Sequence, residues 1–193
     1  MKSKTVRMLC ECAIMVALAF TLSCIKLFQM PLGGSVTLVS MLPIMLIGIK
    51  YGSLVGLGTG FVYSLTQLVQ ALIEGDVFPY CETSGILILC VLFDYLLPFT
   101  VLGIAGIFKE KGLFKNKEIS CYIGIILAVF IRFICHYITG VFIWGQWAEG
   151  MSAYLYSFLY NGAYLSVDMI LCISVTLLML RHKAIKNIIQ LDK

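Results

Sequence analysis

Charged residues are scarce in this chain of 193 residues: Asp, Glu, Lys and Arg make up 12% of it, whereas 61% is hydrophobic. A soluble domain carries about 25% charged residues because its exterior faces water. The composition therefore excludes a soluble globular domain and indicates an exterior that faces lipid. Only helices or a closed barrel satisfy the backbone inside a bilayer. The chain has long apolar runs and lacks ten-residue stretches of strict alternation, so it predicts an all-α, polytopic membrane protein.

Sequence motifs of nucleotide, metal and acyl-transfer chemistry are also missing. The chain contains no GxxxxGK[ST] loop, no HExxH or other paired metal-ligand spacing, and no nucleophile elbow. It has no detectable internal repeat, although a transporter that moves its own substrate often has duplicated halves. These absences argue against an enzyme, a metal site, a cofactor and ATP hydrolysis through a P-loop. They favour a binding subunit that draws its energy from another protein.

The eight cysteines form neither a disulfide framework nor a metal-ligand pattern. Most of them lie in or beside hydrophobic runs, where Cys acts as a small apolar residue. Only Cys81 falls in a predicted outer loop. We therefore expect the cysteines to be packing residues.

Basic residues occur in clusters that are separated by segments with almost no Lys or Arg. The clusters lie at residues 2–7, 50, 109–117 and 181–193, and the predicted outer loops between them carry Glu74, Asp76, Glu82 and Glu149. This alternation is the positive-inside pattern, which predicts an even number of spans with both termini in the cytoplasm. It accounts for the net charge of +4 without a nucleic-acid partner.

Six hydrophobic segments of a single domain (1–193) are predicted to cross the bilayer as one helical bundle. Their approximate ranges are 6–27, 36–49, 52–73, 85–108, 119–143 and 153–180. The loop at 28–36 contains the helix breakers Pro31, Gly33 and Gly34 and is placed outside. The second span is short and contains Pro43, which predicts a kink or a tilt. Glu11, in the first span, is expected at the cytoplasmic surface in contact with water.

Small residues on the first span suggest a surface for close packing. Ala13 and Ala17 have the small-xxx-small spacing that lets another helix approach. The spacing alone fits both a partner protein and packing within this chain.

Ionisable side chains lie inside the later spans. A charged residue at the centre of a span costs about 2.5–3.5 kcal/mol by insertion scales, so Asp94 needs a partner or a function. Arg132 and His136 lie four residues apart and share a helix face, and Arg132 could form a structural salt bridge with Asp94. The 3.6-residue period also places one polar stripe on the sixth span. Its members are Ser157, Asn161, Tyr164 and Asp168.

Two stretches combine aromatic rings with hydrogen-bonding groups: FICHYITGVFIWGQW at 133–147 and YLYSFLYNGAY at 154–164. Tyr and Trp also gather at bilayer interfaces. An interfacial belt, however, does not need His, Asn and Gln among its rings. The mixture is typical of a site for a flat, partly polar heteroaromatic ligand.

The runs HYITGVFIWGQWAEG and LYSFLYNGAYL, with PLGGSVTLVSMLPIMLIGIKYG and FDYLLPFTVLGIAG, resemble a known family. It is the thiamine-specific substrate-binding (S) component of energy-coupling factor (ECF) transporters. The resemblance covers most of residues 8–175. It implies a bacterial plasma-membrane protein of six helices that holds thiamine in its outer half. It also implies partners, namely a membrane coupling subunit and two ABC ATPases that drive import.

The resemblance assigns thiamine binding to six positions: Asp94, Tyr95, His136, Trp144, Tyr156 and Asn161. Asp94 stands where the family is expected to have Glu. Trp144 corresponds to a ring-stacking residue, and Tyr156 and Asn161 to residues that bond the aminopyrimidine. These last two are five residues apart, about 140° around an ideal helix, so one ligand must span that arc or the helix must be distorted. Ala13 and Ala17 resemble the docking surface for the coupling subunit.

Three other functions stay open at this point. The first is an S component for another vitamin or precursor, such as riboflavin, biotin or hydroxymethylpyrimidine. The second is an intramembrane enzyme that uses Asp94 and His136 as acid and base. The third is a structural or assembly protein whose polar groups only hold helices together.

Overall fold

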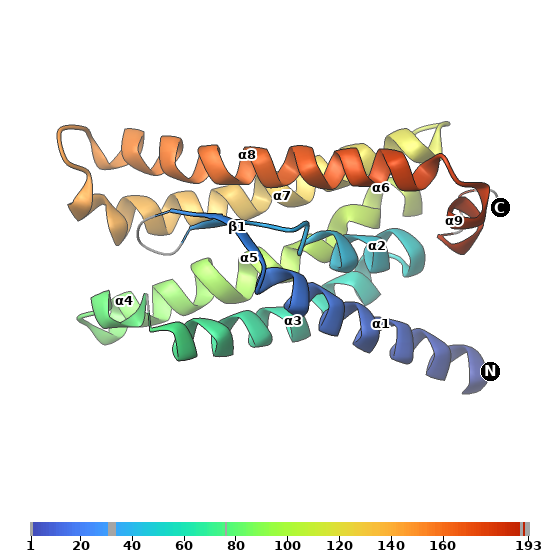
Figure 1. Cartoon of the computed structure of the whole chain (residues 1–193), viewed down its shortest axis with the longest axis horizontal. Coiled ribbons are helices and arrows are strands. Elements are labelled where there is room, and N and C mark those ends of the chain that lie inside the picture. Colours follow the sequence, from blue (N-terminus) through green and yellow to red (C-terminus); the bar gives the residue numbers. More distant parts are fainter. Residues whose placement is uncertain (1, 31–33, 76, 190, 192–193) are drawn as a thin grey trace.

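The computed structural model describes residues 2–30, 34–75, 77–189 and 191, and Figure 1 shows them as an elongated bundle of helices. In chain order the elements are α1 (Lys2–Ser23), β1 (Lys26–Gln29), β2 (Ser35–Thr37), α2 (Leu42–Tyr51), α3 (Ser53–Glu74), η2 (Phe78–Tyr80), α4 (Ser84–Cys90), η3 (Val91–Leu96), α5 (Leu97–Thr100), η4 (Val101–Gly106), α6 (Ile107–Glu110), α7 (Lys117–Phe142), η5 (Trp144–Trp147), α8 (Ala153–Leu180) and α9 (Lys183–Ile188). Elements α4 to α6 follow one another without a break. The fold is therefore all-α apart from one short hairpin, β1–β2.

Four of the described helical segments are long and apolar enough to cross a membrane: Ser3–Ser23, Ser84–Glu110, Lys117–Phe142 and Ala153–Leu180. Helix α2 is apolar but only 10 residues long. Helix α3 has 22 residues and carries Gln67 and Gln70 in its second half. The lengths and composition agree with a multi-pass membrane protein.

The segment between α1 and α2 differs from the predicted loop and span boundaries. Residues 26–29 pair antiparallel with 35–37, so the end of the predicted first span and the start of the second belong to the β1–β2 hairpin. Helix α2 starts at Leu42, and Pro43 lies in its first turn. A proline is favourable there because the first N–H groups of a helix have no partner within it. Pro43 thus begins the helix and does not kink it. Pro31 and Gly33 lie outside the described residues.

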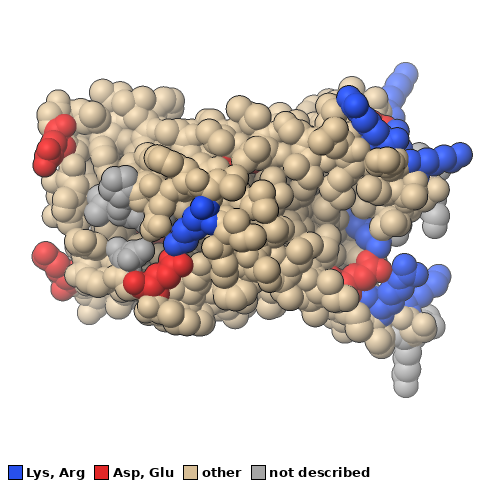
Figure 2. Space-filling view, in the orientation of Figure 1, with Lys and Arg blue, Asp and Glu red and all other residues tan. Residues whose placement is uncertain are grey.

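The two ends of the bundle differ in the sign of their charged side chains (Figure 2). Both termini lie at the same end in Figure 1, and Figure 2 shows Lys and Arg side chains gathered there, with acidic side chains at the opposite end. Glu11, on α1 at the basic end, is partly exposed to solvent as expected and also has partners within the chain. Its carboxylate accepts from Tyr51 Oη at 2.7 Å and Arg7 Nε at 2.9 Å, and it also pairs with Lys50. These contacts tie α1 to the end of α2.

Helices α2 and α3 approach η4 to backbone contact. A Cβ atom added to Gly103 would lie 2.0 Å from the carbonyl carbon of Gly56, and one added to Gly48 would lie 2.1 Å from the Gly103 carbonyl oxygen. Real Cβ atoms do not come this close to a backbone. Glycine at these positions therefore lets α2, α3 and η4 pack with their backbones in contact.

Gly103→Ala should lower the thermal unfolding temperature of the detergent-purified protein. Overpacking costs about 1–3 kcal/mol even where side chains can move, and the neighbour here is backbone. Gly58→Ala on α3 is the matched control, because its Cβ meets nothing within 4 Å and Ala is the better helix former. If Gly103→Ala unfolds at the wild-type temperature, the close packing is wrong.

Candidate functional site

A cavity lies among α3, η3, α7, α8 and the β1–β2 hairpin. The sequence assigned six residues to a ligand site, and the structure brings all six to the wall of this cavity: Asp94, Tyr95, His136, Trp144, Tyr156 and Asn161. Arg132, Tyr160, Tyr164 and Asp168 line it as well. The polar stripe predicted on the sixth span faces inward, since all of its members are buried in α8.

Asp94 and Tyr95 lie in η3, a π-helical turn in the middle of a continuous span. Pro98, four residues after Asp94, has no N–H and its ring clashes with the carbonyl of the residue four positions earlier. The chain responds with a wider turn, in which Leu97 N donates to Leu92 O. Single π-helical turns are frequent at functional sites. Here the turn occurs where Asp94 and Tyr95 reach the cavity.

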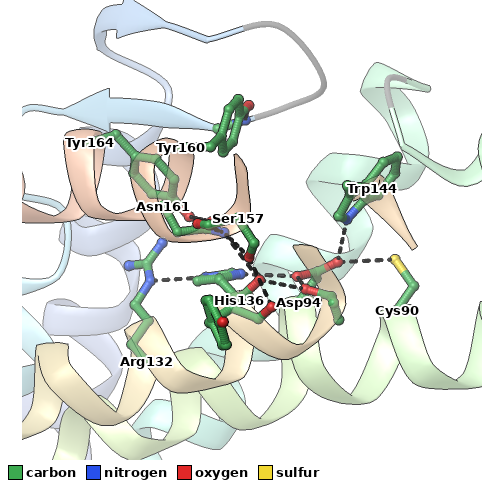
Figure 3. Close-up of polar contacts among 12 residues, drawn as sticks. Cys90, Asp94, Arg132, His136, Trp144, Ser157, Tyr160, Asn161 and Tyr164 are labelled. Carbon is green, nitrogen blue, oxygen red and sulfur yellow. Dashed lines mark hydrogen bonds and ion pairs between the residues drawn. The ribbon is translucent and has the colours of Figure 1, made fainter. Parts of the chain in front are cut away.

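The Asp94 carboxylate is held by donors from three directions, as Figure 3 shows. Its Oδ1 lies 3.0 Å from His136 Nδ1 and accepts from Thr139 Oγ1. Its Oδ2 accepts from Trp144 Nε1 at 3.2 Å and contacts the Cys90 thiol at 3.6 Å. These contacts satisfy both oxygens of a carboxylate that would otherwise be an unpaired polar group inside an apolar helix bundle.

Arg132 contacts His136 and not Asp94. Arg132 Nε donates to His136 Nε2 at 3.3 Å, and the guanidinium lies 4.4 Å from the centre of the Phe99 ring. No ion pair of Arg132 occurs among the described residues. A direct Asp94–Arg132 salt bridge, which the sequence had left possible, is therefore wrong, because His136 lies between the two groups.

Asn161 fastens α8 to α7. Its Nδ2 donates to His136 O at 3.1 Å and to Ser157 O at 3.0 Å, while Tyr164 Oη donates to its Oδ1 at 3.2 Å. The amide nitrogen is thus committed within the protein, and Oδ1 keeps one lone pair. Tyr156 also lines the cavity, so the two residues separated by about 140° reach one site.

Sequence reasoning missed two neighbours of Asp94 and one contact of Tyr160, a residue of the predicted aromatic stretch. Thr139 follows His136 by three residues, a spacing that places both on one helix face, so its contact with Asp94 could have been found. Cys90 precedes Asp94 by four residues and carries the same kind of signal. Tyr160 Oη accepts from Gly34 N at 3.0 Å. No local sequence pattern predicts this contact between α8 and the hairpin.

Aromatic rings lie at the wall of the cavity and directly behind it. Tyr95 stacks on Phe78 of η2 with ring centres 5.5 Å apart. Tyr80 meets Trp144 and Trp147 edge-on at 6.1 and 5.3 Å. On α8, Tyr156 lies 5.6 Å from Tyr160. Faces and edges of rings are therefore available to a flat ligand.

A polar group of residues from α1, β1 and α3 lines another part of the wall. Ser23 Oγ lies 3.0 Å from both Gln67 Nε2 and Gln70 Oε1. Glu74 accepts from Gln70 Nε2 and from Lys26 Nζ, each at 2.9 Å. This group links the hairpin to the end of α3.

The charges around the cavity leave an excess of one negative charge. The carboxylates that line it are Glu74, Asp94 and Asp168, and the cations are Lys26 and Arg132. These are counted in their ordinary states at neutral pH, with His136 neutral. A singly charged cation would balance the cavity.

Ala13 and Ala17 lie outside the cavity. Both are exposed on α1, whereas Val16 and Ala19 of the same helix are buried against the bundle. Leu9 and Ile14 on the exposed side are 59% and 65% accessible. This face of α1 is apolar and unpacked within the chain.

The fold and the composition define a helical membrane protein with a polar and aromatic cavity in its bundle. The family described as "Thiamine transporter protein (Thia_YuaJ)" matches residues 9–188, and the chain belongs to this family. It is a transport protein and not an enzyme, so the alternative of acid–base catalysis by Asp94 and His136 is wrong.

Individual relatives carry the same name. The chain is 34% identical to the thiamine transporter ThiT of Bacillus subtilis (strain 168) over 188 residues, which is 92% of each chain. It is 26% identical to ThiT of Lacticaseibacillus paracasei over 130 residues, 63% of this chain and 61% of that one. The solved structure of ThiT from Listeria monocytogenes superposes with a TM-score of 0.72 at 24% identity, covering 94% of this chain and 98% of that chain. At that identity the likeness establishes the fold.

Asn161→Ala should lower the unfolding temperature of the ligand-free protein. The substitution leaves the buried Tyr164 hydroxyl without its acceptor and removes a link between α7 and α8, a loss of about 1–3 kcal/mol. Tyr156→Phe is the control, since the structure records no hydrogen bond of its hydroxyl among the described residues. Equal unfolding temperatures for Asn161→Ala and Tyr156→Phe would contradict the structural role of the amide.

Proposed function

We propose that this protein is the high-affinity thiamine-binding S component of an ECF-type ABC vitamin transporter. The observation that carries the proposal is the Asp94 carboxylate, bonded at both oxygens and surrounded by aromatic rings in a cavity with one excess negative charge. Membership of a thiamine transporter family supports it.

Thiamine fits this cavity chemically. Its thiazolium ring carries a permanent positive charge that balances the excess negative charge of the wall. Aromatic faces such as that of Trp144 add cation–π attraction of about 0.5–2 kcal/mol each. In a medium of low dielectric constant the attraction of Asp94 to the cation is stronger than in water.

The aminopyrimidine ring needs acceptors for its amino group and donors for its ring nitrogens. In our proposal Asn161 Oδ1 accepts from the amino group with its remaining lone pair, and the Tyr156 hydroxyl bonds the same ring. His136 and Tyr95 complete the site.

The proposed topology has six spans in one domain, with both termini in the cytoplasm of a bacterial cell. Helices α2 and α3 supply the spans that their composition alone does not identify. The basic end of the bundle faces the cytoplasm, in agreement with the positive-inside rule. The cavity, toward the acidic end, then faces outward and captures thiamine outside the cell.

Import against a gradient requires an energy source that this chain does not encode. In our proposal a membrane coupling subunit with two ABC ATPases supplies it. The coupling subunit docks on α1 at Ala13 and Ala17, since small exposed residues let a second helix approach closely and gain dispersion contacts.

Asp94→Asn should weaken thiamine binding by at least about thirtyfold, because removal of one member of a buried charge pair costs about 2–5 kcal/mol. The measurement is calorimetric titration of the purified protein with thiamine. Riboflavin, biotin and hydroxymethylpyrimidine are titrated beside it and should bind weakly or not at all. Glu149→Gln, which removes an exposed carboxylate outside the cavity, is the matched control. A folded Asp94→Asn protein with wild-type affinity would refute the site.

Ala13→Trp with Ala17→Trp should abolish thiamine uptake by cells and co-purification with the coupling subunit, while thiamine binding by the isolated protein persists. The bulky rings prevent the close helix contact, and the cavity lies elsewhere in the bundle. Ser166→Trp is the control, because Ser166 is a small exposed residue on a different helix, α8. Normal uptake by the double variant would rule out this docking surface.

A further inference from the structure

His136 lies between two groups of opposite charge at the cavity wall. Its Nδ1 is 3.0 Å from Oδ1 of Asp94, which lies on η3. Its Nε2 is 3.3 Å from Nε of Arg132, which lies on α7 as His136 does. Both His136 and Arg132 are more than nine-tenths buried. Figure 3 shows the three side chains in a row.

The donor at one end of this row determines where the histidine proton is. A guanidinium can only donate, so Nε2 must be the acceptor and carries no proton. In a neutral imidazole the proton is then on Nδ1, from which it donates to Asp94. Phe99 lies 4.4 Å from the guanidinium and holds it in place.

We infer that Arg132 is a positioning residue: it keeps His136 neutral, with its proton on Nδ1, and thereby keeps Asp94 free to balance a cationic ligand. A proton on Nε2 would remove the acceptor of Arg132 and place a second positive charge 3.3 Å from the guanidinium. It would also turn the Asp94–His136 contact into an internal ion pair. The negative charge of Asp94 would then be balanced by His136 and not by the ligand. The inference rests on the proposed function, because only a cationic ligand makes that cancellation harmful.

The other groups that face His136 do not replace Arg132. Tyr164 on α8 meets the ring at 6.3 Å in an edge-on arrangement. Asn161 donates to the main-chain oxygen of His136 and not to its ring, and the Thr139 hydroxyl lies near the same oxygen while it donates to Asp94. Asp168 on α8 lines the same cavity and accepts from Thr37 N. Among the described residues, Arg132 is the donor recorded at Nε2.

Nitrogen NMR of histidine-labelled protein tests the proton position directly. The chain has only two histidines, so His182→Gln, in the turn before α9, assigns the His136 signals. The wild type should show a neutral, Nδ1-protonated His136 between about pH 6 and 8, the range in which an ordinary histidine titrates. Arg132→Met should show a His136 that becomes protonated within that range. A wild-type His136 protonated on Nε2 overturns the inference without any variant.

Thiamine affinity over the same pH range gives the functional readout. The wild type and His182→Gln should change less than about threefold, whereas Arg132→Met should lose up to about tenfold per pH unit toward acid, the slope expected for one coupled proton. Arg132→Lys retains a charged donor and should restore part of the flat profile. Parallel profiles for wild type and Arg132→Met would refute the positioning role.

The two hypotheses fail in different ways. If the proposed function is wrong, the wild type binds no thiamine at any pH, while the NMR result can still be obtained. If only the inference is wrong, the wild type binds thiamine, and Arg132→Met either keeps the wild-type pH profile or leaves the His136 signals unchanged.

Discussion

A carboxylate inside an apolar membrane span needs hydrogen-bond donors around it, and the bundle supplies them to Asp94. The donors come from α7, η5 and the preceding turn of the same span: His136, Thr139, Trp144 and Cys90. Pro98 widens the helix at this point, and the glycine contacts among α2, α3 and η4 place the span close to its neighbours. Loss of these donors would leave a charge in an apolar interior, at a cost of several kcal/mol.

The same carboxylate links stability to ligand choice. Its hydrogen bonds stabilise the negative charge without neutralising it, since none of the four donors is a Lys or Arg. His136 lies between Arg132 and Asp94. Arg132 therefore offsets part of the charge of the cavity without forming a direct ion pair with Asp94. The result is a wall with one excess negative charge and several aromatic faces. A cation with a flat ring system satisfies both properties, whereas a neutral ligand would leave the charge unbalanced.

Sequence reasoning selected six candidate residues that the structure places at one cavity, but it did not give the contacts among them. The helical period correctly placed Arg132 beside His136 and turned Ser157, Asn161, Tyr164 and Asp168 inward. It could not show that His136 separates Arg132 from Asp94, because those residues lie on different segments 38 and 42 positions apart in the chain. The contacts of Glu11 with Lys50 and Tyr51 were not predicted for the same reason, since these residues are about forty positions away in sequence. The β1–β2 hairpin was missed because its strands are short and are stabilised by pairing rather than by propensity.

The sequence by itself determined that this is an all-α membrane protein of one family, with a polar and aromatic site in its later spans. Composition and the 3.6-residue period are local properties, so they can be read before the chain folds. Only the tertiary structure decided which donor meets which oxygen of Asp94, which face of α1 stays exposed, and that the hairpin meets Tyr160 and Asp168 of α8. Those features depend on contacts between distant segments, whose geometry is set by packing of the whole bundle and not by any one stretch of residues.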